Sequence, residues 1–150
     1  MILISHRGNI FGKEVDFENS PDFINNALKL NYYVEVDIWY INEKLYLGHD
    51  EPQYQIEFDY LNNERFFVHC KNDLSLELMS KLNLNCDYFW HQNDKYTLTS
   101  KNRVWVYPKQ KVLKNSIVVL PELSEDQDLS ISKGVCSDFI AKYKYLLEQI

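Results

Sequence analysis

The chain has 150 residues, a formal net charge of −6, and a composition of 45% hydrophobic and 25% charged residues. This composition is typical of a globular protein and excludes disordered, collagen-like and coiled-coil chains, and the length predicts one domain over residues 1–150. Apolar runs are only a few residues long, as at residues 117–120, whereas a membrane-spanning helix needs about 20. We therefore expect a protein with no stable membrane insertion.

Three further features of the sequence bear on the cellular compartment of the protein and on its binding partners. Residues 1–4 are too short an apolar stretch for a secretory signal, so we expect a cytoplasmic protein. The three cysteines are odd in number and form no Cys-x-x-Cys pair, which favours buried reduced thiols over a disulfide framework or a zinc site. An acidic chain without a lysine and arginine cluster also lacks the charge pattern that binds nucleic acid. The oligomeric state is left open.

The predicted elements alternate along the chain. Strand-length runs of apolar, β-branched or aromatic residues cover residues 2–4, 33–40, 44–47, 65–70, 86–90, 103–107, 116–120 and 134–139. The first helix is predicted after Ser20, because Ser20, Pro21 and Asp22 supply an N-cap hydroxyl, a proline in the first turn and an acid near the helix N-terminus. Further helices are predicted from about residue 73 and over the C-terminal stretch from residue 139.

This alternation predicts an α/β fold with a largely parallel sheet. A regular (β/α)8 barrel usually needs about 250 residues. Connections such as residues 107–116 leave room for little more than one helical turn. We therefore expect either a shortened barrel or another arrangement of these elements.

All four histidines follow a strand-like run or lie within one. They are His6, His49, His69 and His91. Because ligands bind at the carboxyl ends of parallel strands, this pattern predicts that the histidines converge on one rim of the sheet. The alternative is that each is a core histidine bonded to a backbone carbonyl, since histidine is intermediate in burial.

The strand at residues 34–38 carries two acids on one face. Side chains alternate across a strand, so Glu35 and Asp37 project together, away from the apolar residues between them. Two adjacent carboxylates repel each other and are costly to desolvate, and a divalent cation is their usual partner. His69 and Lys71 alternate in the same way and add one possible ligand and one cation. The alternative is an amphipathic strand whose acids face water.

Five short motifs in residues 1–71 carry a family resemblance. They are Ile-Ser-His-Arg-Gly at 4–8, Glu-Asn-Ser-Pro at 18–21 opening a helix, Glu-Val-Asp at 35–37, Gly-His-Asp at 48–50, and a strand that ends in Lys71. In residue type, order and approximate spacing they resemble the glycerophosphodiester phosphodiesterase family of the PLC-like phosphodiesterase superfamily. In the second half of the chain, Gly-Val-Cys-Ser-Asp at 134–138 is similar to the motif of that family's last barrel strand.

The resemblance implies a fold and an activity. The implied fold is α/β, a compact, reduced TIM-barrel-like (β/α) barrel with short or missing helices. The implied activity is metal-dependent hydrolysis of a small-molecule phosphodiester, similar to a glycerophosphodiester, as in lipid metabolism. By the same resemblance, a neighbouring hydroxyl of the substrate attacks phosphorus and gives a cyclic phosphate; whether this product is released or opened by water is left open.

The resemblance also implies roles for individual residues. His6 and His49 are implied to be the acid/base pair, and imidazoles titrate in the range needed to activate a hydroxyl and to protonate a departing alkoxide. Which of the two is the acid is left open. Arg7 and Lys71 are implied to contact the phosphate, and Glu35 and Asp37 are implied to ligate Mg2+ or Ca2+. The metal ion and the two cationic side chains would neutralise the charge on the phosphoryl oxygens.

One departure from the family pattern concerns the third metal ligand. The family has an acid two residues before the lysine, where this chain has His69. Imidazole suits Mn2+ or Zn2+ better than Mg2+ or Ca2+, so either His69 completes a softer site, with Mn2+ as a possible ion, or another acid substitutes. Glu122 is a candidate, because it follows a strand that ends at a proline. The alternative for Glu122 is a solvated side chain.

The other departure concerns the substrate. The family inserts a small substrate-binding subdomain after Asp50, and residues 51–63 leave little space for it. Trp90, Trp105 and Tyr107, near strand ends, are candidates to bind the alcohol groups, or else to pack the core. Two other functions remain open, namely a phospholipase D-like lyase that releases a cyclic phosphate and a non-catalytic protein that binds a phosphorylated metabolite. The role of Asp138 is ambiguous.

Overall fold

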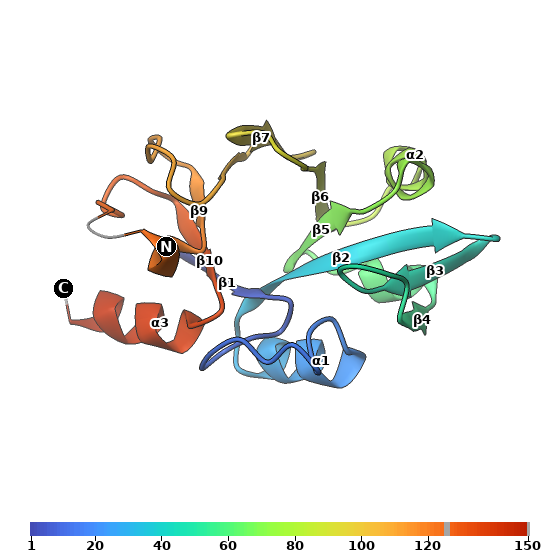
Figure 1. Ribbon diagram of the computed structural model, residues 1–150, viewed down its shortest axis with the longest axis horizontal. Coiled ribbons are helices and arrows are strands. Elements are labelled where there is room, and N and C mark those ends of the chain that lie inside the picture. The colour runs from blue at the N-terminus through green and yellow to red at the C-terminus, as the bar shows by residue number, and fades with distance from the viewer. Residues whose placement is uncertain (125–126, 150) are drawn as a thin grey trace.

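A curled mixed sheet forms the body of the protein in the computed structural model, which describes residues 1–124 and 127–149 (Figure 1). Its ten strands are β1 (Ile2–His6), β2 (Tyr33–Ile41), β3 (Lys44–Leu47), β4 (Tyr54–Ile56), β5 (Phe66–Cys70), β6 (Asp87–Trp90), β7 (Tyr96–Leu98), β8 (Val104–Val106), β9 (Ile117–Val119) and β10 (Gly134–Ser137). The helices are α1 (Pro21–Lys29), α2 (Asp73–Lys81) and α3 (Ile140–Glu148), with short 3-10 helices η1 (Phe58–Leu61) and η2 (Pro121–Leu123).

The sheet combines parallel and antiparallel pairs. Neighbouring strands are parallel along the path β6, β5, β2, β1, β10, β9 and β8. Antiparallel pairs extend it, with β3 and β4 added to β2 at one place and β7 added to β8 at another. Strand β2 is the branch point, because it pairs with β1, β3 and β5.

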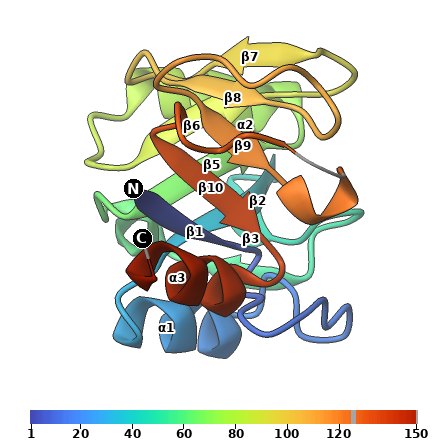
Figure 2. The same cartoon turned by 90° about the vertical axis from the view of Figure 1, so that its left-hand side faces the viewer.

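The expected α/β fold, a reduced TIM-barrel-like (β/α) barrel, is wrong. Strands dominate, the sheet is mixed, and it curls into a half-barrel with only three short helices among the described residues (Figures 1 and 2). The reason is the length of the connections. A parallel pair needs a crossover of a dozen or more residues, whereas β2 and β3 are joined by the two residues Asn42 and Glu43. Both have positive φ values, 49° and 61°, as a tight hairpin turn requires.

Local sequence explains where the first two helices begin. In α1, the Ser20 hydroxyl accepts from the Phe23 N–H, and Pro21 occupies the first turn. In α2, the Asn72 side chain accepts from Ser75 N while Ser75 Oγ accepts from Asn72 N, which forms a capping box. Helices α1, α2 and α3 contact β2, β5, β6, β1 and β10, on the outer side of the curve (Figures 1 and 2).

Two apolar layers lie on the two faces of the sheet. The outer layer, under the helices, includes Val34, Val36 and Val68. The inner layer fills the concave side and consists of Ile4, Phe67, Phe89, Trp105, Ile117, Val119 and Cys136. Side chains alternate along each strand, so every second residue points to the concave side. Beside the inner apolar layer, the side chains on this side are polar, and they include Glu35, Asp37 and His69. The functional candidates therefore lie on the concave side of the sheet.

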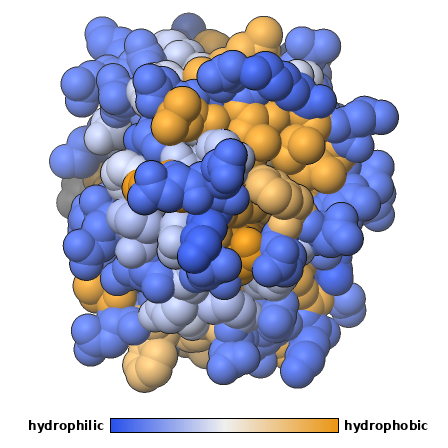
Figure 3. Space-filling view, turned by 90° about the vertical axis from the view of Figure 1, so that its right-hand side faces the viewer, coloured by the Kyte–Doolittle hydropathy of each residue, from blue (hydrophilic) through white to orange (hydrophobic). Residues whose placement is uncertain are grey.

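The remaining surface is mixed. Figure 3 views the side that carries α2, β3 and β4, where apolar side chains gather among hydrophilic ones, and exposed apolar residues of this region include Leu74 and Phe58. All three cysteines are buried and free, as the sequence predicts. Among the helices of residues 1–124 and 127–149, none has the length and apolar character to cross a membrane.

Candidate functional site

The candidate site lies where strand β2 changes its neighbour. On one edge, β2 pairs with β1 as far as Glu35 and with β3 from Ile38 onward, so Asp37 lies in the gap between them. Other segments satisfy the Asp37 backbone: its N–H donates to Asn19 Oδ1 over 3.0 Å, and its carbonyl accepts from Gly48 N over 3.1 Å. The gap thus brings the segments that follow β1 and β3 against the two acids of β2.

Unusual backbone geometry holds Arg7 and His49 beside this gap. Arg7 has a left-handed φ of 56°, and it is fixed because its N–H donates to Glu35 O and its carbonyl accepts from Asn19 N. Such a conformation is uncommon for a residue other than glycine and persists where surrounding contacts impose it. Gly48 precedes His49, and a Cβ at Gly48 would lie 2.0 Å from a backbone oxygen. Glycine is therefore required at that position.

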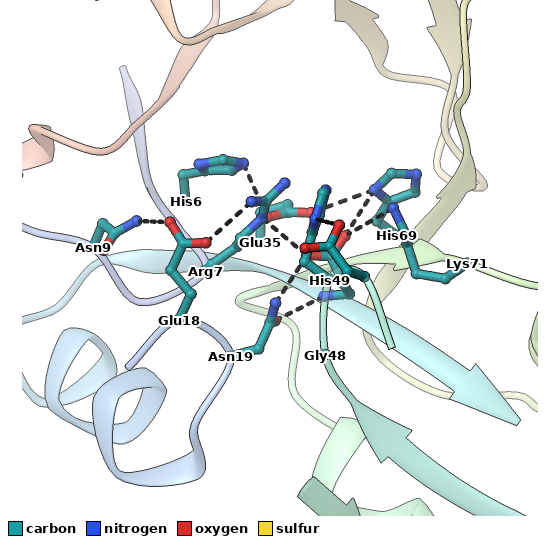
Figure 4. Close-up of polar contacts among 12 residues, drawn as sticks. His6, Arg7, Asn9, Glu18, Asn19, Glu35, Gly48, His49, His69 and Lys71 are labelled. Carbon is teal, nitrogen blue, oxygen red and sulfur yellow. Dashed lines mark hydrogen bonds and ion pairs between the residues drawn. The ribbon is translucent and has the colours of Figure 1, made fainter. Parts of the chain in front are cut away.

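Glu35, Asp37 and His69 form a cluster of possible metal ligands (Figure 4). One ligand atom from each lies within 4.8 Å of the others. His69 Nδ1 is 3.0 Å from Asp37 Oδ1 and 3.7 Å from Glu35 Oε1. On the other side of the ring, His69 Nε2 donates to His91 O over 2.8 Å, and a carbonyl can only accept. In neutral His69 the Nδ1 lone pair therefore faces the two carboxylates, the arrangement of a metal-binding imidazole.

The oxygens of this cluster fit a divalent cation. Glu35 Oε2 and Asp37 Oδ1 are buried and have no hydrogen-bond partner among the described residues. Buried polar atoms are nearly always bonded, so each unpaired oxygen needs an explanation, and a bound cation supplies one. Carboxylates suit Mg2+, Ca2+ and Mn2+, and the imidazole shifts the preference toward Mn2+.

Nearby cations set the ionisation of the two acids. Arg7 Nε lies 3.0 Å from Asp37 Oδ2, and Lys71 Nζ lies 3.9 Å from Asp37 Oδ1. Burial raises the pKa of Asp37, but the adjacent His69 imidazole and the charges of Arg7 and Lys71 outweigh it and hold this pKa well below its usual range. Burial and the neighbouring charge of Asp37 raise the pKa of Glu35. Asp37 is therefore the more firmly ionised acid.

His6 is oriented by a carboxylate from the other end of the chain. Its Nδ1 lies 2.6 Å from Asp138 Oδ1, and its Nε2 lies 3.8 Å from Glu35 Oε2. Burial lowers the pKa of His6, but Asp138 and Glu35 outweigh burial, and the pKa is raised. Asn9 Nδ2 donates to Asp138 Oδ1 over 2.8 Å and to Glu18 Oε1 over 2.9 Å. This network fixes the imidazole with Nε2 on the side of the metal-ligand cluster.

His49 has a similar arrangement in a more open position. Its Nδ1 lies 2.7 Å from Asp50 Oδ1, and its side chain is 37% exposed. Burial and the charge of Arg7 lower the pKa of His49, in the opposite direction to that of His6. In both histidines, a carboxylate next to Nδ1 leaves Nε2 for a ligand.

A cavity of about 530 Å³ joins these side chains. Its walls include six residues identified from the sequence: His6, Arg7, Glu35, His49, His69 and Lys71. Trp105 and Tyr107 line the same cavity. Trp90 lies elsewhere, because it packs against the outer apolar layer. Alternation explains this difference, since Phe89 beside Trp90 belongs to the inner layer.

Glu122 lies outside the metal-ligand cluster. Its carboxylate accepts hydrogen bonds from Ser137 Oγ over 3.0 and 2.9 Å and from Asp138 N over 2.9 Å. The structure therefore gives Glu122 a role in holding the end of β10, where Asp138 orients His6. His69, and not Glu122, is the third member of the cluster.

Two residues of the site, Glu18 and Asn9, are given no role from the sequence, and the role of Asp138 is left open there. Asp138 pairs with His6, and Glu18 accepts from Arg7 NH1 over 3.1 Å. Both lie in the motifs at residues 134–138 and 18–21, so those motifs contained a signal for them. Asn9 lies in no motif, so the sequence contains no signal for its role.

Comparison with known proteins adds nothing to this description of the site, since no protein family, curated protein or solved structure matches the chain.

Proposed function

We propose that the chain is a metal-dependent phosphodiesterase that uses His6 and His49 as an acid/base pair on a small glycerophosphodiester-like substrate. One observation carries this proposal: two imidazoles, each with Nδ1 against an aspartate, line the same cavity as Glu35 and His69, and Asp37 lies buried beside these two possible metal ligands. The motifs at residues 4–8, 35–37 and 48–50 support the same activity, through their resemblance to the phosphodiesterase family.

The charge of the cavity supports an anionic substrate. Arg7, Lys71 and Lys109 line it, together with all four histidines, whereas Glu35 is its only lining carboxylate among the described residues. The chain as a whole has a net charge of −6. This local excess of cations suits a phosphodiester, whose phosphoryl oxygens they would neutralise.

The proposed reaction is transfer of the phosphoryl group to a hydroxyl of the substrate itself. The oxygen of this hydroxyl attacks phosphorus, and the bond from phosphorus to the leaving alcohol breaks. One imidazole removes the proton of the attacking hydroxyl, and the other donates a proton to the departing oxygen. Arg7 and Lys71 hold the phosphoryl oxygens during this step. A divalent cation on Glu35, Asp37 and His69, namely Mg2+, Ca2+ or Mn2+, would supply further charge neutralisation.

The setting we propose rests on the sequence and not on this reaction. We propose that the substrate is a small molecule, that nucleic acid is not a partner, and that the protein acts in the cytoplasm.

Metal-free protein, incubated with glycerophosphoglycerol and with each of Mg2+, Ca2+ and Mn2+ in turn, tests the proposal. We expect phosphorus NMR to detect a cyclic phosphate or a phosphate monoester only when a metal is present. His6→Ala and His49→Ala should each lower kcat by about 10²- to 10⁴-fold, the usual contribution of one acid or base. Tyr145→Ala, an exposed position on α3, is the matched control and should leave kcat unchanged.

The same experiment separates the other functions. A cyclic phosphate that accumulates without conversion to a monoester would identify a lyase. Calorimetric binding of the diester without any product would identify a non-catalytic binding protein and contradict the proposal, as would full activity in both histidine variants.

A further inference from the structure

The cavity has two chemically different ends. The polar end holds His6, His49 and His69 together with Arg7, Glu35 and Lys71, whereas His91 stacks on Tyr107 at the other end. The apolar end, on the side of β8 and β9, is lined by Trp105, Tyr107, Pro108, Val119, Leu120 and Leu123. A ligand that fills the cavity therefore contacts charged groups at one end and mainly aromatic and aliphatic side chains at the other.

Packing makes the aromatic part of the apolar end rigid. The Phe89 and Trp105 rings lie 4.6 Å apart between centroids. The His91 and Tyr107 rings lie 5.1 Å apart and are tilted by only 15°, so they are stacked. Rings held by stacking lose little freedom when they contact a ligand. This wall is therefore preformed.

Backbone geometry fixes the aliphatic part. Leu120 has a left-handed φ of 45°, although it is neither glycine nor asparagine and precedes a proline. A bulky residue in this region is a conformational outlier, and such outliers gather at ligand-binding sites. Its N–H donates to Cys136 O over 2.7 Å, and the 3-10 turn that begins at Pro121 follows directly. Leu123 in this turn is 54% exposed and lines the cavity.

The charge of Lys109 disfavours a cationic group at the apolar end. Quaternary ammonium groups bind aromatic cages, but Lys109 lines this cavity and its only lining carboxylate among the described residues is Glu35, at the polar end. A positively charged alcohol such as choline or ethanolamine would thus meet a lysine, and no carboxylate of residues 1–124 and 127–149 lines this end to compensate it. An uncharged group meets no such repulsion.

We propose that the apolar end binds the leaving alcohol of the phosphodiester, and that this alcohol is uncharged and apolar. The inference rests on the proposed function. The alcohol that carries the attacking hydroxyl is polar by definition, so it suits the polar end beside the imidazoles. The other ester group then lies against Trp105, Tyr107, Leu120 and Leu123. A cavity of about 530 Å³ is large enough for a diester with a short alkyl or aryl group.

A series of diesters that differ only in the leaving alcohol tests the inference. The substrates are glycerophosphohexanol, glycerophosphoglycerol and glycerophosphocholine, and the measurement is kcat/KM for each with Mn2+ present. All three leaving groups are alkyl alcohols, so the comparison is not dominated by aryl-type activation of the leaving group. We expect the hexyl ester to exceed each of the other two by at least about 10-fold, because a few buried methylenes discriminate by that much.

A variant pair makes the test specific to this end of the cavity. Leu123→Asp places a carboxylate at this end, and it should lower kcat/KM for the hexyl ester and raise it for the choline ester. Leu98→Asp is the control, since Leu98 is 60% exposed on β7 and does not line the cavity. Circular dichroism spectra of both variants verify folding, and the control should keep the wild-type preference.

The outcomes separate the two proposals. Equal kcat/KM values for the three diesters, or a preference for choline in the unmodified protein, would overturn the inference and leave the proposed function standing. A preference unaffected by Leu123→Asp in a folded protein would also overturn it. No hydrolysis of any diester with any metal would overturn both.

Discussion

Asp87 at the start of β6 and Asp37 in β2 are both fully buried carboxylates on the concave side of the sheet, yet their surroundings differ. The oxygens of Asp87 accept four hydrogen bonds, from Thr99 Oγ1, Ser100 Oγ, Lys101 N and Arg103 NH1. Asp37 Oδ1 has no hydrogen-bond partner among the described residues, and neither has Glu35 Oε2 beside it. The inner apolar layer, with Phe67 and Phe89, lies between the two groups.

The difference separates a structural site from a site that can bind a ligand. Asp87 is saturated by donors of its own chain, and it ties the segment at residues 99–103 to β6. The oxygens of Glu35 and Asp37 are only partly satisfied, which is costly unless something else binds them. Burial alone therefore does not mark a candidate ligand-binding acid, whereas burial with oxygens that accept no hydrogen bond from the described residues does.

The largest expected effect is on activity. Glu35→Gln removes one charged ligand while conserving shape, and kcat should fall by about 10²- to 10³-fold, as when one stabilising group is lost from an active site. Asp87→Asn should leave kcat per folded molecule unchanged. Steady-state kinetics, normalised to the folded fraction, measures both. Equal losses in the two variants would break the distinction between the sites.

Asp87 should matter more than Glu35 for the free energy of unfolding, in contrast to their expected effects on kcat. Asp87→Ala leaves Arg103 and three other donors without their acceptor, and it should lower the free energy of unfolding by about 3–5 kcal/mol. Urea denaturation of the variant and the unmodified protein measures this loss. A loss below about 1 kcal/mol would show that Asp87 does not tie the segment at residues 99–103 to the sheet.

Glu35→Gln should have a smaller and opposite effect on stability. Because burial and Asp37 raise the pKa of Glu35, the folded state disfavours its charged form. Without metal at pH 7, the variant should gain about 0.5–2 kcal/mol in the free energy of unfolding.

The pH dependence of that gain checks its origin. A carboxyl whose pKa is raised in the folded state lowers the free energy of unfolding as the pH rises. The loss begins near its pKa in the unfolded chain, about 4.3, and continues until the pH passes its pKa in the folded protein. The difference between the variant and the unmodified protein should therefore be small near pH 4 and grow toward pH 7. A difference that is constant with pH, or a loss of stability, would contradict the assigned cause.

Much of the site could be predicted from local sequence. Strand alternation places Glu35 and Asp37 on one face of β2 and His69 on the same face of β5 as Phe67, and the pairing of β2 with β5 brings their ligand atoms within 4.8 Å. Alternation also separates Trp90 from Phe89, which explains why Trp90 packs in the outer layer. The start of α1 was also predictable, because N-cap chemistry is local to Ser20 and Pro21.

Long-range relations could not be predicted in the same way. The contact between His6 and Asp138 spans 132 positions and depends on β1 and β10 being neighbours. The half-barrel itself depends on short connections such as Asn42 and Glu43, which turn the chain back where a barrel would need a crossover. The unpaired oxygens of Glu35 and Asp37 are likewise visible only when every neighbour is in place.

Calorimetric titration of the metal-free protein with Mn2+ tests the central claim most directly. If Glu35, Asp37 and His69 form a metal centre, one Mn2+ should bind per chain. Binding should be lost in Asp37→Asn and retained in Asp87→Asn, where the saturated carboxylate is changed instead. No binding to the unmodified protein, or equal binding by both variants, would contradict the assignment of the metal centre.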